Sequence, residues 1–139
     1  MSRENMELVQ HGYELLNTGR VEEAVALYHP EIEMHLARDP DGVVGLDFRD
    51  TYRGVDGVLQ FLSQMSEVWE EPKWTPEAYY DAGDDVLVDV RFTGRGRNSG
   101  IEIERAMAHI CTVRDGQLLR HETYWDRNEA RAAVRLDVM

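Results

Sequence analysis

The sequence has few of the residues and segments that mark several large classes of protein. It contains one cysteine, Cys111, so the chain cannot form an internal disulfide and is indifferent to the redox compartment. No apolar run approaches the roughly 20 residues that a membrane-spanning helix needs. The N-terminal stretch MSRENMELVQ is charged and amphipathic, unlike a secretory signal sequence. These features predict a soluble, cytoplasmic protein.

Positive charge is also scarce. The chain has 15 Lys and Arg residues against 27 Asp and Glu residues, which gives a net charge of −12. A nucleic-acid partner is therefore not expected, because phosphate binding needs a basic face. Docking on an anionic membrane is disfavoured for the same reason. The charge does not restrict the ligand of an internal pocket, since a pocket can differ in sign from the whole molecule.

What is present is the pattern of one α+β domain. The 139 residues, taken as a single domain over 1–139, can enclose one core, and no repeat or linker divides them. Helical spacing of apolar residues predicts helices over 6–16, 21–28 and 55–69, and a further helix after residue 126. Alternating patterns predict strands over 31–36, 74–80, 86–94, 101–113 and 118–125. Short turns between the last four strands favour antiparallel hairpins, and helices grouped before the sheet favour α+β. Residues 37–54 are predicted mainly as a long loop.

The strand predicted over 101–113 carries the most informative pattern. Its odd-numbered residues are the more apolar set, so they should face the core and take Arg105 and His109 with them. A cation in the core costs several kcal/mol unless it is paired or faces a hydrated cavity. Two polar residues on an apolar inward face therefore suggest a pocket with convergent polar groups. The alternative is that Arg105 lies in solvent and His109 is a hydrogen-bonded core residue.

The next strand and its helix continue this pattern. Leu119, His121, Thr123 and Trp125 share a face, which makes His121 and Thr123 pocket candidates. On the opposite face Arg120 and Glu122 can form an ion pair. Asp126 and Glu129 have the D-x-x-E form of a helix N-cap. Glu122 and Asp126 are therefore interpreted as structural rather than catalytic.

Two other motifs receive structural interpretations. His29, Glu31, Glu33 and His35 would share one face of a continuous strand, and such residues can bind metals. Pro30 disrupts that strand and the apolar residues lie on its other face, so a solvated outer face is favoured and no metal site is predicted. The stretch GRGRNSG is interpreted as a hairpin turn, because a strand follows it where a dinucleotide site needs a helix. No cofactor is expected.

The order of elements and several stretches resemble the NTF2-like superfamily, particularly its SnoaL-like and ketosteroid-isomerase-like branch. The matching stretches are YELLNTGRVEEAVALYHPEIEMH (13–35), YRGVDGVLQFL (52–62), DAGDDVLVDVRFTGRGR (81–97) and VRDGQLLRHETYWDRNEA (113–130). The resemblance implies a curved antiparallel sheet wrapped around helices into a cone. It also implies an apolar pocket inside the cone and, commonly, a homodimer through the outer sheet face.

The resemblance also implies where catalytic residues would lie. Ketosteroid isomerases use a base Asp followed by Pro, which Asp39-Pro40 resembles a few residues late. Their oxyanion tyrosine falls near Gly12, so Tyr13 is one step and about 100° away around the helix. SnoaL-type cyclases carry a His at the position of His109, but their acid/base Asp falls at Thr123 here. A threonine cannot accept a proton near neutral pH, so no known catalytic set is intact.

Two functional hypotheses follow. The first is an isomerase or cyclase that acts by proton transfer on a small apolar carbonyl-bearing or polycyclic molecule, with His109 and Asp39 as catalytic candidates. The second is a non-catalytic module that binds a hydrophobic ligand or acts as a dimeric partner. A purely structural role in a larger assembly is a third alternative. The candidate binding residues are Tyr13, Met34, Tyr52, Met65, Arg105, His121, Thr123 and Trp125.

Overall fold

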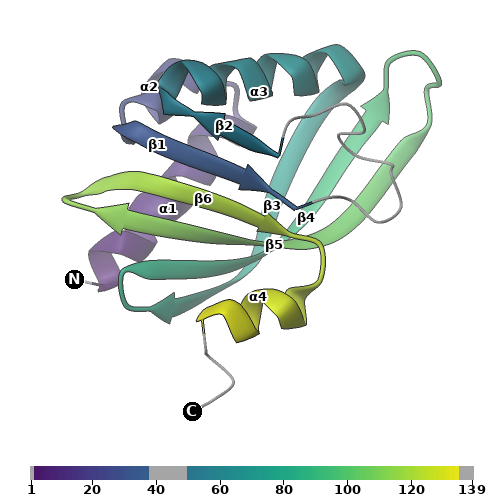
Figure 1. Ribbon diagram of the computed structural model, residues 1–139. Coiled ribbons are helices and arrows are strands. Elements are labelled where there is room, and N and C mark those ends of the chain that lie inside the picture. Colours follow the sequence, from purple (N-terminus) through teal and green to yellow (C-terminus); the bar gives the residue numbers. More distant parts are fainter. Residues whose placement is uncertain (1, 38–49, 135–139) are drawn as a thin grey trace.

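The computed structural model describes residues 2–37 and 50–134 and has the predicted α+β architecture (Figure 1). Its elements are α1 (Ser2–Asn17), α2 (Val21–Val25), β1 (Tyr28–Leu36), β2 (Thr51–Arg53), α3 (Gly54–Val68), β3 (Trp69–Ala82), β4 (Asp85–Gly96), β5 (Glu102–Arg114), β6 (Gln117–Tyr124) and α4 (Arg127–Val134). The six strands form one sheet in the order β2-β1-β6-β5-β4-β3. Neighbouring strands are antiparallel except β1 and β6, which are parallel. No helix among the described residues is long and apolar enough to cross a membrane.

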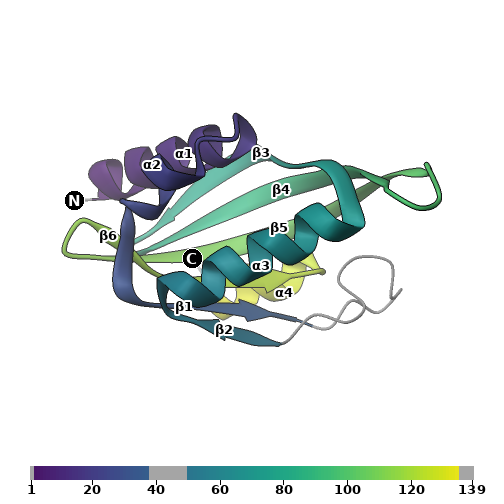
Figure 2. The same cartoon turned by 90° about the horizontal axis from the view of Figure 1, so that it is seen from above.

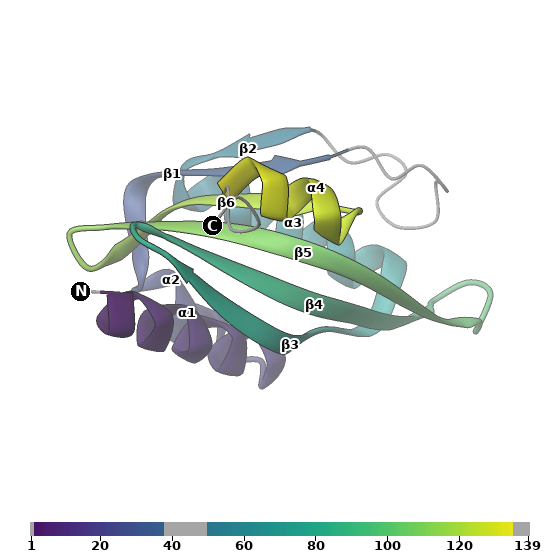
Figure 3. The ribbon, with the colours of Figure 1, turned by 90° about the horizontal axis from the view of Figure 1, so that it is seen from below.

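The sheet curves around the N-terminal helices, and the C-terminal helix lies on its other side. Figures 2 and 3 show α3 and α4 on opposite sides of the sheet. Residues of α1, α3 and the inward sheet face line one cavity, so these helices share the concave face. The predicted cone is therefore present as an open, curved sheet with its apolar core between sheet and helices.

Several element boundaries differ from the sequence prediction, and β3 begins at Trp69 instead of residue 74. The second helix ends at Val25, and β1 begins at Tyr28 and includes Pro30. Proline has no N–H to donate, and here it lies where the β1–β6 register is irregular, between Tyr28 and Glu33. The short strand β2 lies inside the predicted loop and pairs with β1, with Tyr52 opposite Met34. Three residues are too few to show an alternating pattern.

The inward face of β5 has the predicted phase. Met107, His109, Cys111 and Val113 are buried, with His109 only 3% exposed. The even-numbered face, predicted to lie outward, is also buried at Ala108 and Ile110. The reason is α4, whose Ala130 packs with Leu87, Ala108 and Ile110 in a second apolar cluster. Both faces of the central strands are covered.

Helix α4 begins at the predicted cap. The backbone N–H groups of Asn128 and Glu129 donate to Oδ1 of Asp126 at 2.8 and 3.4 Å. That carboxylate satisfies N–H groups that the first turn leaves without partners and favours the helix dipole. The predicted Arg120–Glu122 ion pair is also present, at 3.1 Å.

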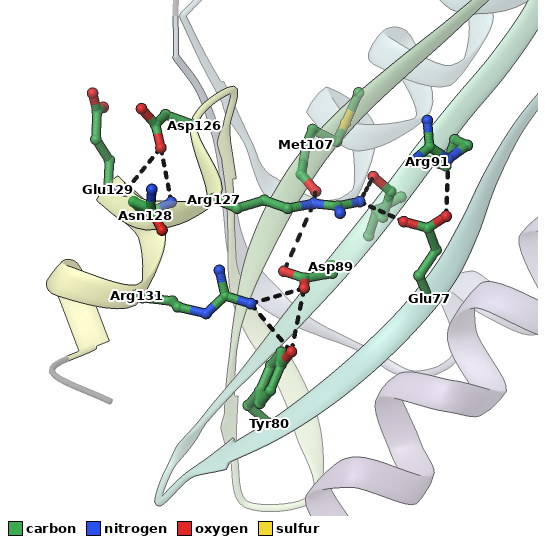
Figure 4. A network of polar contacts seen from close by, with 11 residues as sticks. Glu77, Tyr80, Asp89, Arg91, Met107, Asp126, Arg127, Asn128, Glu129 and Arg131 are labelled. Atoms are coloured by element: carbon green, nitrogen blue, oxygen red, sulfur yellow. Dashed lines mark hydrogen bonds and ion pairs between the residues drawn. The ribbon is translucent and has the colours of Figure 1, made fainter. Parts of the chain in front are cut away.

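Two arginines then hold α4 against the outer sheet face (Figure 4). Nη2 of Arg131 donates to Oδ2 of Asp89 at 3.0 Å and to the hydroxyl of Tyr80 at 3.1 Å. Arg127 reaches further across the sheet and donates to the carbonyls of Met107 and Val90 at 3.1 and 3.0 Å. Asp89 is 6% exposed, so a buried carboxylate on β4 anchors the helix.

Candidate functional site

A cavity of about 80 Å³ lies between α1, α3 and the concave sheet face. Aliphatic and aromatic side chains form most of its wall, among them Leu8, Phe61, Leu62 and Trp74. No Asp, Glu, Lys or Arg lines it within the part of the chain that the structure describes. A mostly apolar wall with a few polar groups is typical of a small-molecule site.

The first of those polar groups are Tyr13 of α1 and His109 of β5. The Tyr13 hydroxyl and Nδ1 of His109 form a hydrogen bond of 2.5 Å. The two rings are parallel within 1°, with centroids 5.8 Å apart. Burial raises the pKa of Tyr13 well above its ordinary value of 10.0. Burial, and the nearby His121, lower the pKa of His109 well below 6.5. Both groups are therefore neutral at pH 7.

This hydrogen bond fixes which nitrogen of His109 remains for a ligand. His109 lines the cavity and Tyr13 occupies its Nδ1, so Nε2 is the ring nitrogen that this bond leaves for a ligand. If the hydroxyl donates to Nδ1, then Nε2 carries the proton and is a donor. If Nδ1 donates to the hydroxyl oxygen, then Nε2 is an acceptor. A neutral histidine in this setting can polarise a carbonyl or accept a proton.

A second imidazole lies beside the first. The ring centroid of His121, from β6, is 4.2 Å from that of His109. Burial lowers the pKa of His121 to about 4, so it too is neutral at pH 7. Its Nδ1 is buried and has no hydrogen-bond partner within residues 2–37 and 50–134. The site therefore contains two adjacent neutral imidazoles, and that of His121 has a buried nitrogen without a hydrogen-bond partner among the described residues.

Thr123 and Cys111 add two more polar side chains to the wall. The strand register sets Thr123 opposite His109 and Cys111 opposite His121. Burial raises the pKa of the Cys111 thiol to about 12, which keeps it protonated and unreactive as a nucleophile at neutral pH. Thr123 is 5% exposed and offers a hydroxyl, where the resemblance would have placed a carboxylate.

The structure brings together five of the sequence-predicted site residues. Those that line the cavity are Tyr13, Met34, His109, His121 and Thr123. Their roles in binding or catalysis stay predictions. The catalytic candidate Asp39 lies outside the described residues.

Four predicted binding residues do not line this cavity. The Arg105 guanidinium lies 4.8 Å from the centroid of the Trp125 ring, and the Trp125 indole N–H donates to the carbonyl of Ala37 at 2.7 Å. Both lie where β5 starts and β6 ends, beyond the cavity wall. Tyr52 and Met65 are each 1% exposed and pack in the core beside the cavity. A strand residue that faces inward therefore does not necessarily line the cavity.

Sequence reasoning also missed residues of the wall. Leu118 lines the cavity in place of the predicted inward Leu119, because a bulge shifts the β5–β6 register between Thr112 and Val113. On α3, Phe61 lines the cavity, while its neighbour Leu59 is 38% exposed. The signal for Phe61 was its spacing from Val58 and Met65, the other buried residues of that helix.

On β1, His35 and Glu33 form surface ion pairs and do not form a metal-binding group. Nε2 of His35 lies 3.0 Å from Oε1 of Glu33, whose other oxygen pairs with Arg53 at 2.5 Å. No group of three or more His, Cys, Asp or Glu side chains that could hold a metal occurs among the described residues.

Comparisons with known proteins agree with this architecture. An NTF2-like protein of unknown function from Burkholderia pseudomallei is 20% identical with a TM-score of 0.77, over 94% of this chain and 97% of that one. TerC, co-crystallised with polyporic acid, is 22% identical with a TM-score of 0.76, over 95% and 98%. A protein from Mesorhizobium loti proposed to be a SnoaL-like polyketide cyclase is 19% identical with a TM-score of 0.68, over 86% and 97%. At these identities the likeness shows the fold alone.

The match at the level of sequence is to a family model. No curated protein matches the chain. A model described as the SnoaL-like domain matches residues 9–121, which include most of the cavity-lining residues, His109 and His121 among them. The chain belongs to the SnoaL-like domain family and has its NTF2-like fold.

Proposed function

We propose that the protein binds a small, largely apolar carbonyl-bearing or polycyclic molecule in the cavity and transfers protons on it, as an isomerase or cyclase. The observation that carries this proposal is the neutral imidazole of His109, which lines an apolar cavity with Nδ1 held by Tyr13. A positioned imidazole is the commonest general acid or base in enzymes. Membership of a family that includes polyketide cyclases supports the same reaction class.

His109 would act through Nε2. As an acceptor, Nε2 takes a proton from the carbon next to the ligand carbonyl, which leaves an enolate and an imidazolium, and the imidazolium then returns the proton to a different carbon. The lowered pKa of His109 makes the imidazole a weak base. Because proton transfer is efficient when the pKa values of donor and acceptor are close, the ligand should be a carbon acid whose proton is already acidified by conjugation.

The test is proton exchange on a bicyclic ketone. 2-Tetralone has an acidified benzylic C–H beside its carbonyl, and loss of that NMR signal in D₂O reports each transfer. We expect the protein to speed exchange above buffer and His109→Gln to remove on the order of 10²–10⁴-fold of that acceleration. His35→Gln, which alters a histidine outside the cavity wall, should exchange like the unaltered protein. Exchange no faster than in buffer would sink the catalytic proposal.

A second candidate function is binding without catalysis. The observation that favours it is that Tyr13 and His109 already satisfy each other, while no carboxylate among the described residues lines the cavity. This reading predicts that 2-tetralone binds, as judged by titration calorimetry, without any exchange of its benzylic proton. The two measurements on one ligand separate the two functions.

We also propose that the protein works as a homodimer in the cytoplasm. Since α4 covers the outer face over β4 and β5, the dimer would use the strip of β1, β2 and β6, which carries the Glu33–His35–Arg53 network. Light scattering measures the mass, and a monomer at micromolar concentration would contradict this proposal.

A further inference from the structure

We infer that the ligand of this cavity is uncharged and carries a hydrogen-bonding oxygen that meets Nδ1 of His121, with hydrocarbon over the rest of its surface. The inference rests on the cavity of the proposed function but not on its catalysis. It assigns His121 a task separate from that of His109: to anchor the ligand.

The first observation is that Nδ1 of His121 is unusual among the buried polar atoms. Within the described residues, three buried side-chain polar atoms lack a hydrogen-bond partner: Nε1 of Trp69, Oδ1 of Asp89 and Nδ1 of His121. Oδ1 of Asp89 lies 3.8 Å from Nε of Arg127, and Trp69 is outside the cavity wall. Only His121 of these three lines the cavity.

An unpaired buried polar atom is costly. Leaving one unsatisfied is strongly unfavourable, so nearly all buried polar groups in native proteins have a partner. A ligand oxygen that occupies the cavity beside His121 would supply that partner. Hydrocarbon at the same place would displace any water there and leave the nitrogen unsatisfied.

The second observation concerns charge. The ionisable side chains of the described wall are all neutral at pH 7. Burial lowers the pKa of His109 and His121, and it raises the pKa of Tyr13, Tyr28 and Cys111. No arginine, lysine or carboxylate from the described residues lines the wall. A carboxylate or ammonium ligand would therefore be desolvated without a counter-charge, which is strongly unfavourable.

The third observation is that four polar side chains of the wall gather on β5 and β6, while the walls from α3 and β3 are apolar. His109, Cys111, His121 and Thr123 occupy facing positions of β5 and β6. In the walls from α3 and β3, the Phe61 and Trp74 ring centroids lie 6.3 Å apart. A neutral ring molecule with an oxygen on one edge matches this division, its oxygen toward β5 and β6.

Three naphthalenes test the inference, because they differ only in one substituent. The probes are 2-naphthol, naphthalene and 2-naphthoate, measured by titration calorimetry at pH 7.5 against the full chain. We expect 2-naphthol to bind on the order of tenfold more tightly than naphthalene, because it can form one additional hydrogen bond, with His121. We expect 2-naphthoate, which is charged, to bind more weakly than both.

Variants then locate the contact. In His121→Phe the advantage of 2-naphthol over naphthalene should fall to within twofold, while naphthalene itself still binds. His121→Leu repeats the test should the larger ring perturb folding. His35→Phe should keep the full advantage, because His35 pairs with Glu33 outside the cavity wall.

Each result supports or overturns the inference. It is overturned by an unchanged hydroxyl advantage in both His121 variants, by loss of that advantage in His109→Phe alone, or by equally tight binding of 2-naphthoate. Failure of all three probes to bind overturns it together with the proposed cavity function. Binding with the expected pattern but without 2-tetralone exchange leaves the inference standing and removes only the catalysis.

Discussion

The side-chain amide of Asn17 pairs with the backbone of Trp74 through two hydrogen bonds. Its Nδ2 donates to the carbonyl of Trp74 at 2.8 Å, and its Oδ1 accepts from the N–H of Trp74 at 3.0 Å. Trp74 lies on β3, the last strand at that edge of the sheet, so the amide occupies backbone groups that a further strand would otherwise pair. Both residues line the cavity. The end of α1 is thereby fixed to the cavity wall.

Removing that amide should destabilise the fold. Asn17→Ala leaves the Trp74 N–H and carbonyl without their partners, and we expect the free energy of unfolding to fall by about 1–3 kcal/mol. Asn17→Asp keeps the acceptor but loses the donor, so it too should lower the free energy of unfolding. Urea denaturation measures both. Gln10→Ala, at an exposed position of α1, should stay within about 0.5 kcal/mol of the unaltered protein. Equal effects of Asn17→Ala and Gln10→Ala would contradict the prediction.

The Tyr13–His109 hydrogen bond should contribute to the free energy of unfolding beyond what burial of the hydroxyl or packing of the rings contributes. Tyr13→Phe keeps the ring but leaves Nδ1 of His109 buried without its partner, and we expect a loss of about 1–3 kcal/mol in the free energy of unfolding. Tyr28→Phe is the matched control, since it deletes a second buried tyrosine hydroxyl of the cavity wall, one for which no hydrogen bond is present among the described residues.

A double-mutant cycle separates the pair from its surroundings. If the two groups interact, the losses in Tyr13→Phe and His109→Phe should not add in the double variant, and the coupling should lie between about 0.5 and 3 kcal/mol. Additive losses would show that the short contact contributes nothing of its own.

Acidification should destabilise the protein through its two buried imidazoles. The pKa of His121 is lowered to about 4 by burial, and that of His109 is lowered too, whereas an unfolded histidine has a pKa near 6.5. The unfolded chain therefore binds protons first, so this stability is complete above about pH 6.5 and is lost as the pH falls toward 4. The slope can reach about 1.4 kcal/mol per pH unit for each imidazole.

Urea denaturation between pH 7.5 and 4.5 measures this slope. His121→Phe should flatten it, because one of the two groups no longer takes up a proton on unfolding. His11→Gln, at an exposed position of α1, should keep the slope of the unaltered protein. Carboxylates with lowered pKa, Glu33 and Glu77, act at lower pH, below about 4.5. A stability that is constant from pH 7 to 5 would contradict the prediction.

Local patterns predicted the fold and part of the site, and long-range contacts account for most of the rest. The alternation in β5 placed His109 inward because the side-chain period of a strand is two, and the cap at Asp126 depends on neighbours only. The inward prediction for Leu119 was wrong because a bulge breaks that period, and no residue type in the sequence indicates the bulge. The Asn17–Trp74 pair joins residues far apart in sequence, so its geometry exists only once α1 lies on the sheet.

The docking of α4 also depends on contacts between residues far apart in the sequence. Its arginines are ordinary helix residues in the sequence, and Asp89 occupies an outward position of a strand. Only the fold shows that Arg131 lies 3.0 Å from the Asp89 carboxylate and that the helix covers Leu87, Ala108 and Ile110. The apolar outward residues of β4 and β5 were the sequence signal that something covers this face.

Asp89→Asn tests whether that carboxylate holds the helix. The variant keeps the shape of the side chain but removes the charge that Arg131 and Arg127 face, so we expect a loss of about 1–3 kcal/mol. Hydrogen exchange should quicken at the amides of α4 and at Ile110, while binding of 2-naphthol in the cavity, on the opposite sheet face, should change little. Glu122→Gln is the control, because its pair with Arg120 lies on the surface and such pairs contribute about 0–1 kcal/mol. If Asp89→Asn were as mild as Glu122→Gln and left α4 protected, apolar packing by Ala130 would be what holds the helix, and the arginines would only set its register.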